Sequence, residues 1–447
     1  MFERMLIAAR GEIALRIIRA CKELGIKTVA IHSEADAESL HVKLSDEDVC
    51  IGPAQPVESY LNIPRIISAA EITGSDAIHP GYGFLSESAE FAEICKSCRL
   101  QWIGPDSSVM EKMSDKAMAR SLMREAGIPI VPGSEGSLED EEEAVEVARE
   151  IGYPVMLKAT AGGGGKGIRI VRKEEELRHL FHSAGTEAEL SFGKRGIYLE
   201  KYLESPRHIE VQVFGDHTGK VISLGERDCS IQRKHQKLIE ESPSPAIDDV
   251  KRREVLDLAV KGASYIKYGS LGTMEFLLDN NGDFYFLEMN TRVQVEHPVT
   301  EMVTGYDLIK EQIRLAATGT SPLFGKEITT RGWAMECRIN AEDPSNGFRP
   351  DPGKVVFYHP PGGPGVRVDS HLYAGYEVPP YYDSLIAKVI TWGEDREEAR
   401  KRMVRSLEEF VIEGIKTTIP YLLSIMKDPD FMAGSFDTSF VERKGYV

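Results

Sequence analysis

The chain has 447 residues, of which 42% are hydrophobic and 28% are charged, and its formal net charge is −17. This length is too great for one hydrophobic core, so we expect roughly two to four structural units. The acidity argues against a general affinity for nucleic acid or for an anionic membrane. An anionic substrate would therefore need a local basic pocket.

Neither a membrane span nor a disulfide framework is expected. No stretch approaches the roughly 20 apolar residues that cross a bilayer, and residues 1–5 run into a strand-like segment without a charged leader or an apolar signal core. The six cysteines are too sparse for a disulfide framework. Cys95 and Cys98 have the spacing of a metal or redox pair, but they lie in a helix-like segment without a second pair, which favours reduced thiols. These features predict a cytoplasmic protein.

The first 110 residues alternate strand-like and helix-like segments. A short apolar run at 5–9 is followed by apolar residues at helical spacing, up to a glycine that ends the helix. These residues are Ile13, Ile17, Cys21, Leu24 and then Gly25. Further strands are expected at 26–31, 76–79 and 101–103. The alternation predicts a doubly wound parallel sheet.

Between about 115 and 320 the pattern changes to hairpins mixed with helices. The expected hairpins join 155–160 to 168–172, 208–214 to the strand that follows 216–219, and the two halves of 272–290. Helices are expected near 250–266 and 307–317. This part of the chain is therefore predicted to be an α+β unit.

Beyond residue 331 the chain is rich in strands. Residues 333–340 alternate apolar and polar side chains, which predicts one face in the core and one polar face. The apolar set is Met335, Cys337 and Ile339, and the polar set is Glu336, Arg338 and Asn340. A helix near 397–410 follows. The whole chain is thus predicted to be a multidomain protein of the α/β and α+β classes.

A glycine run at 162–167 matches two nucleotide-binding patterns only in part. Gly162, Gly164 and Gly167 have dinucleotide-binding spacing, but that motif needs a following helix, and residues 168–171 read as a strand. The phosphate-loop pattern fails because Lys166 is followed by glycine. What remains is a glycine-rich hairpin tip whose backbone N–H groups can contact phosphates between Lys158 and Lys166. The alternative is a flexible surface turn.

The hairpin at 272–290 carries two glutamates that predict a metal site. A four-residue loop at 280–283 would place Asp279 opposite Phe284. The same register sets Glu275 opposite Glu288, with Asn290 on their face. Two opposed carboxylates repel each other, and Mg²⁺ relieves that repulsion. In the alternative, a slipped register leaves one glutamate in solvent.

The segment after Asn290 carries groups that suit an oxyanion substrate. If 291–296 is extended, Arg292, Gln294 and Glu296 share one face. A guanidinium binds a planar oxyanion, an amide orients it, and a carboxylate removes its proton. His297, which precedes a proline, is expected to be structural. The loop 226–237 concentrates positive charge, which indicates either a solvated loop or a cluster near phosphates.

The motifs together resemble biotin carboxylase, the ATP-grasp subunit of the biotin-dependent carboxylases, over essentially the whole chain. They lie at 10–14, 79–87, 162–167, 226–237, 288–301, 336–344 and 373–384. The resemblance implies a Rossmann-like N-terminal domain at 1–114 and an ATP-grasp domain at 115–320 with a lid at about 131–204. It also implies a β-rich C-terminal domain at 331–440.

The resemblance also implies an activity and its cofactors. The activity is the ATP-dependent carboxylation of biotin by bicarbonate through carboxyphosphate, a ligase reaction that is the first half of a reaction such as that of acetyl-CoA carboxylase in fatty acid biosynthesis. ATP, Mg²⁺ or Mn²⁺, and biotin on a carrier protein are the implied cofactors and substrate. The final acyl acceptor (acetyl-CoA, propionyl-CoA or pyruvate) is not specified by this sequence.

The implied roles fall on four sets of residues. The nucleotide set is Lys116, Lys158, Gly163, Gly164, Gly165, Lys166, Glu200, Lys201, Leu203, His208, Gln232, His235, Glu275 and Glu288. Within this set, Lys116, Lys158 and His208 contact the phosphates, and Glu200 and Lys201 contact the adenine end. The bicarbonate set is Lys237, Arg292, Gln294 and Val295. The metal set is Glu275, Glu288 and Asn290. Glu296 is the general base, and Arg338 and Tyr82 are the biotin-binding residues; the catalytic residues are Glu296, Arg292, Arg338 and Lys237.

Two departures from the family pattern stand out. Ala9 occupies a position where the family usually has asparagine. Lys166 occupies a position that is often arginine, so a phosphate would meet the point charge of an ammonium there instead of a two-pronged guanidinium. The single Met-Lys pair, Met426-Lys427, lies in a helix-like stretch and does not resemble a biotin attachment hairpin. We therefore expect a homodimer that accepts a separate biotinylated carrier protein and works with separate carboxyltransferase subunits.

Three other functional classes are alternatives to the interpretation as a biotin carboxylase. One is an ATP-grasp ligase that joins a carboxylate to an amine, which biotin dependence would separate from a biotin carboxylase. Another is a nucleotide sensor or scaffold, which a turnover assay would identify. A nicotinamide oxidoreductase is disfavoured by the strand after the glycine run.

Overall fold

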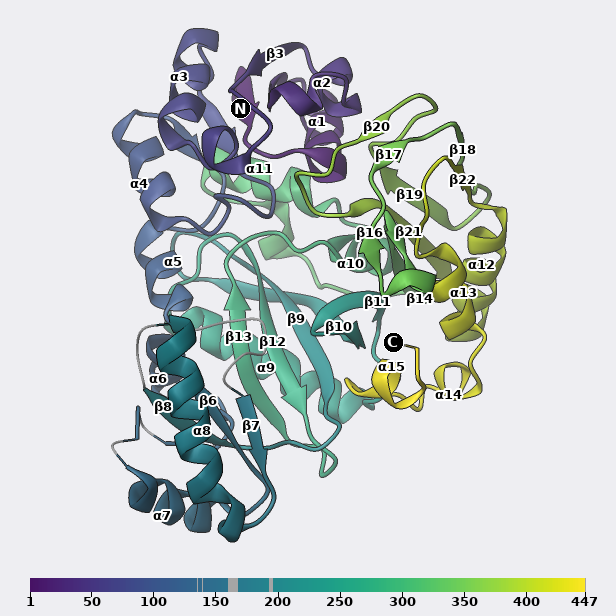
Figure 1. Ribbon diagram of the computed structural model, residues 1–447. Helices are drawn as coiled ribbons and strands as arrows, with labels where there is room; N and C mark the ends of the chain where they lie inside the picture. Colours follow the sequence, from purple (N-terminus) through teal and green to yellow (C-terminus); the bar gives the residue numbers. More distant parts are fainter. Residues whose placement is uncertain (135, 139, 160–167, 193–195, 447) are drawn as a thin grey trace. The chain divides into compact units, whose positions relative to one another are not determined.

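The computed structural model describes residues 1–134, 136–138, 140–159, 168–192 and 196–446, which form two compact units (Figure 1). The first unit comprises Met1–Ala119, Arg207–Glu275 and Glu288–Val447, and the second comprises Arg120–Pro206 and Phe276–Leu287. Within the described ranges, no helix combines the length and apolar character that a membrane span requires.

The N-terminal part of the first unit is a five-stranded parallel sheet in the order β3-β2-β1-β4-β5, as the sequence predicts. Its strands are β1 (Arg4–Ile7), β2 (Lys27–His32), β3 (Glu47–Cys50), β4 (Ala77–His79) and β5 (Gln101–Trp102). The segments around and between them are α1 (Gly11–Glu23), η1 (Glu34–Asp36), α2 (Leu40–Leu44), η2 (Pro56–Glu58), α3 (Ile63–Thr73), α4 (Ala89–Ser97) and α5 (Ser107–Ser114). Met5 and Ile7 belong to the core that includes α1, whereas Leu6 belongs to the core that includes α3 and α4. The sheet is therefore covered on both faces.

The first helix ends where the sequence predicts it, at Gly25. This glycine has φ of 74°, a value that costs glycine no steric strain. Its N–H donates to the carbonyl of Lys22 at 3.2 Å, and the N–H of Ile26 donates to the carbonyl of Cys21 at 2.9 Å. These two bonds satisfy carbonyls of the last helical turn that have no partner within the helix.

An eight-stranded sheet in the order β13-β12-β9-β10-β11-β14-β21-β19 is built from strands between residues 207 and 393. Its strands are β9 (Arg207–Gly215), β10 (Val221–Arg233), β11 (Gln236–Ser242), β12 (Leu271–Leu278), β13 (Phe284–Asn290), β14 (Trp333–Asn340), β19 (Val366–Ser370) and β21 (Leu385–Gly393). β11 and β14 are antiparallel neighbours, with Ile239 opposite Cys337. One sheet thus includes strands from both sides of residues 320–331.

The tip of the β12–β13 hairpin differs from the prediction. Gly282 donates its N–H to the carbonyl of Asp279 at 3.1 Å, and Asp279 donates its own to the carbonyl of Asp283 at 3.0 Å. The loop is therefore three residues long, closed by Gly282 at φ 86°. The predicted four-residue loop, with Asp279 opposite Phe284, is wrong. The direct opposition of Glu275 and Glu288 that was deduced from it does not follow.

The structure corrects one expectation about a polar segment. Residues 226–237 are not a loop, since they lie on β10 and β11 and around their turn, and Arg227, Asp228 and Ser230 are buried. The polar face predicted for β14 includes Glu336, which is as fully buried as the apolar residues on the opposite face. Both segments therefore carry buried charge, whereas Lys234 and His235 at the β10–β11 turn are exposed.

Helices and short strands complete the first unit. The helices are α9 (Asp249–Tyr265), α10 (His297–Thr304), α11 (Leu308–Thr318), η3 (Pro322–Gly325), η4 (Pro344–Asn346), α12 (Arg396–Glu409), α13 (Ile419–Met426), α14 (Pro429–Met432) and α15 (Phe440–Arg443). The short strands are β15 (Glu342–Asp343), β16 (Arg349–Pro350), β17 (Gly353–Lys354), β18 (Phe357–His359), β20 (Glu377–Val378) and β22 (Val411–Glu413). α12 packs on β14 and β21, and α10 packs on β10, β11, β14 and β21 (Figure 1). α10 thereby brings its N-terminus to the sheet.

The second unit has its own sheet and core. Its strands β6 (Val155–Ala159), β7 (Ile168–Val171) and β8 (Ile197–Lys201) form an antiparallel sheet in the order β7-β6-β8. Helices α7 (Glu141–Ile151) and α8 (Glu174–Phe192) pack on it, and α6 (Lys116–Glu125) begins in the first unit and ends in the second. The predicted pairing of 155–160 with 168–172 is confirmed. The glycine run at 162–167 that joins these strands, Lys166 included, lies outside the described residues.

Candidate active site

Lys237, near the start of β11, is the centre of a buried cluster in the first unit. Its Nζ lies 2.6 Å from a carboxylate oxygen of Glu210, 2.8 Å from Glu275 and 2.7 Å from Glu296. An ammonium group has three N–H donors, so all three are used on carboxylates. Burial alone would lower the pKa of Lys237, but the three carboxylates outweigh burial and raise it well above its ordinary value. Lys237 is therefore a permanent cation.

Glu275 on β12 is surrounded by donors. Besides Lys237, it accepts hydrogen bonds from the amides of Asn290 at 2.9 Å and Gln294 at 3.2 Å, and His208 Nε2 lies 2.9 Å from its second oxygen. Burial would raise the pKa of Glu275, but Lys237 and His208 more than compensate and lower it. Glu275 thus stays ionised over the whole neutral range.

Glu296 lies at the N-terminus of α10 and is fully buried. Its Oε1 accepts from Lys237, and its Oε2 accepts from Arg338 Nη2 at 3.0 Å. Burial would raise the pKa of Glu296, but Lys237, Arg338 and Arg227 hold it well below its usual range. The carboxylate is therefore in the ionised form that a general base requires.

The segment 291–296 does not have the extended conformation on which the shared face of Arg292, Gln294 and Glu296 was conditional. Glu296 has φ −81° and ψ 8°, which is not a strand conformation. The expected groups nevertheless meet, since Arg292 donates to Gln294 Oε1 at 2.8 Å and to Asn290 Oδ1 at 2.9 Å. His297 is fully buried, and its Nδ1 lies 2.8 Å from the carbonyl of Gln294. The structural role predicted for His297 agrees with this position.

The two proposed metal ligands differ in their surroundings. Glu275 is buried among Lys237, His208 and two amides, whereas the side chain of Glu288 is 41% exposed, with Lys116 Nζ at 3.5 Å. The Oδ1 of Asn290 accepts from Arg292, so this oxygen faces a cation. Carboxylate oxygens are the hard donors that Mg²⁺ prefers. Glu275 and Glu288 fit such an ion better than Asn290 does.

The remaining nucleotide candidates of the first unit lie around β9 and the β10–β11 turn. His208 is buried, and its Nδ1 lies 2.8 Å from Gln232 Nε2. His235, at the turn, is exposed and has φ of 63°. Gln232 thus fixes the ring of His208 while His235 is open to solvent.

The second unit brings together a different set. Lys158 on β6 and Arg120 on α6 both pair with the buried carboxylate of Glu200 on β8. Lys201 donates to the carbonyls of Gly152 at 2.9 Å and Tyr153 at 3.1 Å. Leu203 follows β8 and is partly buried. Lys158 and Glu200 therefore form a charged pair on adjacent strands, whereas Lys201 is engaged by the backbone.

Sequence reasoning missed several residues that hold the cluster in place. Arg227 is fully buried and donates to Glu210 at 2.5 Å, to Gln212 at 2.7 Å and to Thr300 at 2.9 Å. The alternation of residues 208–214 held a signal for Glu210, because it places this carboxylate on the face of His208. Glu87, within the 79–87 motif, lies 3.1 Å from Arg292 Nε.

Lys388 on β21 is a further residue that no motif indicated. It is fully buried, donates to the carbonyl of Val295 at 2.7 Å, and lies 3.1 Å from Glu12. The hydroxyl of Tyr82 donates to the same carboxylate of Glu12. Lys388 thereby ties the 10–14 motif to the backbone just before Glu296.

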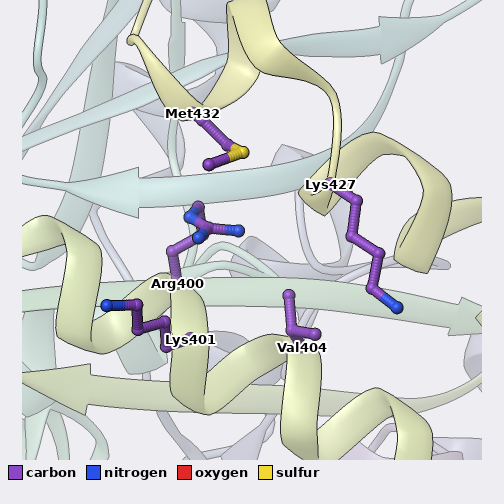
Figure 2. A pocket seen from close by; sticks show the side chains of 5 residues that line it. All are labelled: Arg400, Lys401, Val404, Lys427 and Met432. Atoms are coloured by element: carbon purple, nitrogen blue, oxygen red, sulfur yellow. The ribbon is translucent and has the colours of Figure 1, made fainter.

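A pocket in the first unit lies apart from these residues. It has a volume of about 320 Å³ and is lined by Arg400, Lys401, Val404, Lys427 and Met432, on and around α12, α13 and α14 (Figure 2). Its cations are already paired, Arg400 with Glu397 at 2.7 Å and Lys427 with Glu408 at 2.6 Å. None of the predicted site residues lines it.

Comparison with known proteins covers the chain in three consecutive matches. Residues 1–110 match the family described as "Biotin carboxylase, N-terminal domain", residues 115–322 "Carbamoyl-phosphate synthase L chain, ATP binding domain", and residues 336–443 "Biotin carboxylase C-terminal domain". Biotin carboxylase 1 of Bacillus subtilis is 57% identical over 443 residues, which are 99% of this chain and 98% of the relative.

Solved structures agree with these matches. A biotin carboxylase–β,γ-ATP complex from Campylobacter jejuni is 51% identical, with a TM-score of 0.93 over 99% of both chains. The biotin carboxylase domain dimer of Hydrogenobacter thermophilus 2-oxoglutarate carboxylase, in complex with MgADP, ADP and bicarbonate, is 53% identical with a TM-score of 0.91. That comparison covers 100% of this chain and 98% of the other.

The five-stranded parallel sheet, the eight-stranded sheet, the buried charge cluster and the matched nucleotide-binding family define an ATP-dependent ligase, and the chain is therefore an enzyme. The relatives match over nearly their full length as well as over that of this chain. The chain belongs to the biotin carboxylase family. The resemblance seen in the sequence motifs is confirmed.

Proposed function

We propose that this chain catalyses the ATP-dependent carboxylation of biotin by bicarbonate, with carboxyphosphate as the intermediate. The observation that carries this proposal is the position of Lys237, whose ammonium contacts Glu275 and Glu296 at once. It links a carboxylate suited to the metal and phosphate side with one suited to act as a base. Arg338, on the other oxygen of Glu296, adds a cation for a second substrate.

The nucleotide-binding residues of this proposal are those that the family resemblance implies. Lys116, Lys158 and His208 meet the nucleotide's phosphates, and Glu200, Lys201 and Leu203 meet the adenine end. Gly163, Gly164, Gly165 and Lys166, with Gln232 and His235, complete the set. Support comes from the ATP-analogue and ADP complexes of the relatives described above. Phosphoryl transfer needs mainly positioning and neutralisation of charge, which these lysines supply.

Glu275 and Glu288 would hold Mg²⁺ or Mn²⁺, with Asn290 nearby. Such an ion, when bound, neutralises charge on the phosphate oxygens. The contribution of the chain is a pair of ionised oxygen donors, one of them kept ionised by Lys237 and His208. The MgADP complex of the 2-oxoglutarate carboxylase relative supports this assignment.

Bicarbonate is held by Arg292, Gln294, Lys237 and the backbone of Val295 in this scheme. Glu296 takes its proton, and the resulting oxyanion attacks the γ-phosphorus to give carboxyphosphate and ADP. The bonds that Lys237 and Arg292 make to protein carboxylates and amides pre-position both cations. Substrate would replace some of these bonds. The bicarbonate complex of the 2-oxoglutarate carboxylase relative supports bicarbonate as a substrate.

Biotin accepts the carboxyl group after carboxyphosphate releases CO₂. Arg338 stabilises the enolate-like oxygen that forms when the ureido nitrogen loses its proton to the phosphate released from carboxyphosphate. Tyr82 is the second biotin-binding residue of this proposal, and its hydroxyl is oriented by Glu12. The direct contact between Arg338 and Glu296 supports a site in which bicarbonate activation and biotin carboxylation use adjacent charged residues.

ATP cleavage is expected to require both bicarbonate and biotin. Phosphate release from the purified chain should be measured with each substrate omitted in turn, using free biotin and a biotinylated carrier protein. The carrier should react more efficiently, because a tethered substrate has a higher effective concentration. ATP cleavage that needs neither biotin nor carrier, but responds to an amine, would instead identify the competing class of ligase.

We also propose that the biotin is carried on a separate protein. Met426 is fully buried at the end of α13, and Lys427, the next residue, pairs with Glu408 at 2.6 Å, so this Met-Lys pair is not an exposed hairpin. A streptavidin blot of the purified chain, produced together with an active biotin ligase, should show no band at 49.7 kDa. A strong band at that mass would contradict the proposal.

The remaining assignments concern assembly and context. We propose a homodimer, supported by the dimer of the Hydrogenobacter relative, with separate carboxyltransferase subunits. The domain limits proposed are 1–114, 115–320 with a lid at about 131–204, and 331–440. A cytoplasmic location is supported by six free cysteines. Acetyl-CoA carboxylation in fatty acid biosynthesis is one context, and the 2-oxoglutarate carboxylase relative illustrates another.

A further inference from the structure

One face of the β11–β14–β21 region carries four ionisable side chains, of which Glu240, Glu336 and Lys388 are buried and Arg338 is partly buried. Glu240 of β11 lies directly opposite Glu336 of β14, and Arg338 of β14 lies directly opposite Lys388 of β21. Because side chains alternate along a strand, Glu336 and Arg338 share this face. Glu241, the next residue of β11, points to the other face. Glu296 contacts Arg338 and so adjoins the same group.

Glu240 and Glu336 form a pair of carboxyl groups removed from water. Both are fully buried, and directly opposed residues have Cβ atoms about 4.5–5.5 Å apart. Glu240 Oε1 accepts from Arg338 Nε at 2.6 Å. Among the described residues, no hydrogen-bond donor reaches Glu240 Oε2 or either oxygen of Glu336. A buried ionised carboxylate without a donor is costly, and a second negative charge opposite it increases that cost.

The surrounding charges favour one proton on the pair. Lys388 is committed to Glu12 and to the carbonyl of Val295 and makes no hydrogen bond to Glu336. Around these groups lie Lys237 on β11, Asp369 on β19, Glu12 on α1, and Glu296 and His297 at the start of α10. Burial raises the pKa of Glu336 well above its ordinary value, and the opposing Glu240 raises it further. Burial also raises the pKa of Glu240, to about 7, although Arg338 opposes this.

We propose that Glu240 and Glu336 share one proton in the active enzyme, with Glu336 neutral and Glu240 ionised, and that Glu240 is the positioning residue for Arg338. The guanidinium is then fixed between two carboxylates, through Nε to Glu240 and Nη2 to Glu296. These bonds use two of its five N–H groups and leave the rest for the substrate oxygen. The role of Arg338 toward biotin rests on the proposed function, whereas the protonation of Glu336 does not.

The proton on Glu336 is tested by infrared spectroscopy at a pH well above 7, where Glu240 is ionised. The carbonyl band of a protonated carboxylic acid should be stronger in the wild-type protein than in Glu336→Gln. Glu241→Gln is the matched control, because it removes an equally buried carboxyl group one residue from Glu240 that faces Arg396 and Trp333 instead. Wild-type and Glu336→Gln spectra that are identical in this region would overturn the proposal.

The positioning role is tested by the pH dependence of turnover. Glu240 gains a proton as the pH falls below about 7, which removes the carboxylate partner of Arg338 and should lower kcat. Glu240→Gln should lower kcat by about 10- to 100-fold with little change in KM for ATP. The residual activity of this variant should lack the acid limb, which is the fall in kcat as the pH drops below about 7. Glu240→Asp, which restores a carboxylate, should recover part of kcat.

Two outcomes would contradict the positioning role: wild-type kcat in Glu240→Gln, or an acid limb that persists unchanged in that variant. A merely structural role would lower the melting temperature without moving the acid limb, and Glu241→Gln is expected to show that pattern. If Glu240→Gln does not fold, the limb of Glu240→Asp is compared with that of the wild type, and an unshifted limb overturns the role. A wild-type enzyme without biotin-dependent turnover would refute the proposed function, while the infrared result for Glu336 would still stand.

Discussion

Glu296→Gln is expected to abolish bicarbonate- and biotin-dependent ATP cleavage while leaving ATP binding nearly intact. The amide cannot accept the proton of bicarbonate, and it removes the anion that lies between Lys237 and Arg338. The loss should be at least the roughly 10²- to 10⁴-fold that a positioned base contributes. Steady-state phosphate release and a direct measurement of nucleotide binding, made on the same preparation, test the two halves of this prediction.

Glu301→Gln provides the matched control. Glu301 is a buried carboxylate on α10, the helix that begins after Glu296, but it pairs with Arg16 at 2.8 Å and Arg367 at 2.6 Å. Its replacement should lower the melting temperature, since Arg16 and Arg367 lose their shared carboxylate and keep only Asp307 and Asp369, yet retain turnover per folded molecule. A kcat of Glu296→Gln within a few-fold of wild type would remove Glu296 from the role of base.

The pH dependence separates Glu296 from Glu240. Because the pKa of Glu296 lies well below its ordinary value, its ionised form persists until the pH falls far into the acid range, and the stability it contributes is lost only there. A fall in activity near pH 7 therefore cannot come from Glu296. It should come from Glu240, whose pKa is about 7.

Local patterns in the sequence predicted elements whose contacts are close along the chain. The apolar spacing of α1 and its end at Gly25 follow from helix geometry, and the hairpin β9–β10 follows from alternation with a turn. The tip of β12–β13 was missed because Gly282 closes a three-residue loop, and one residue changes the register. The burial of Arg227, Asp228 and Ser230 was not predicted, because the charged segment 226–237 was interpreted as a loop.

The candidate site was predictable where its residues cluster in one segment. Asn290, Arg292, Gln294 and Glu296 lie within seven residues, and they meet although the segment is not extended. Glu240 and Lys388 could not be found in this way, because each reaches the cluster through strand pairing with β14. Such pairings join segments about 50 to 100 residues apart, and neither periodicity nor motif spacing specifies them.

Glu288→Lys is expected to abolish metal-dependent turnover without unfolding the protein. The side chain of Glu288 is 41% exposed, and its partner Lys116 lies at 3.5 Å, so the pair contributes about 1 kcal/mol or less to stability. Lysine would instead place a cation where a divalent ion has to bind. At about 4 Å and an effective dielectric constant near 20, one pair of unit charges interacts by about 4 kcal/mol. This corresponds to more than a 100-fold loss in metal affinity.

Turnover as a function of magnesium concentration measures this effect, with a thermal melt to verify folding. Glu327→Lys is the matched control, because it makes the same change of charge at an exposed position beside Lys326 and should leave the magnesium dependence unaltered. Glu288→Gln should be intermediate, since it removes the negative charge without adding a positive one. If Glu288→Lys kept normal turnover and normal magnesium dependence, the ion would have to be held without Glu288, and Glu275 would be the only carboxylate left from the proposed pair.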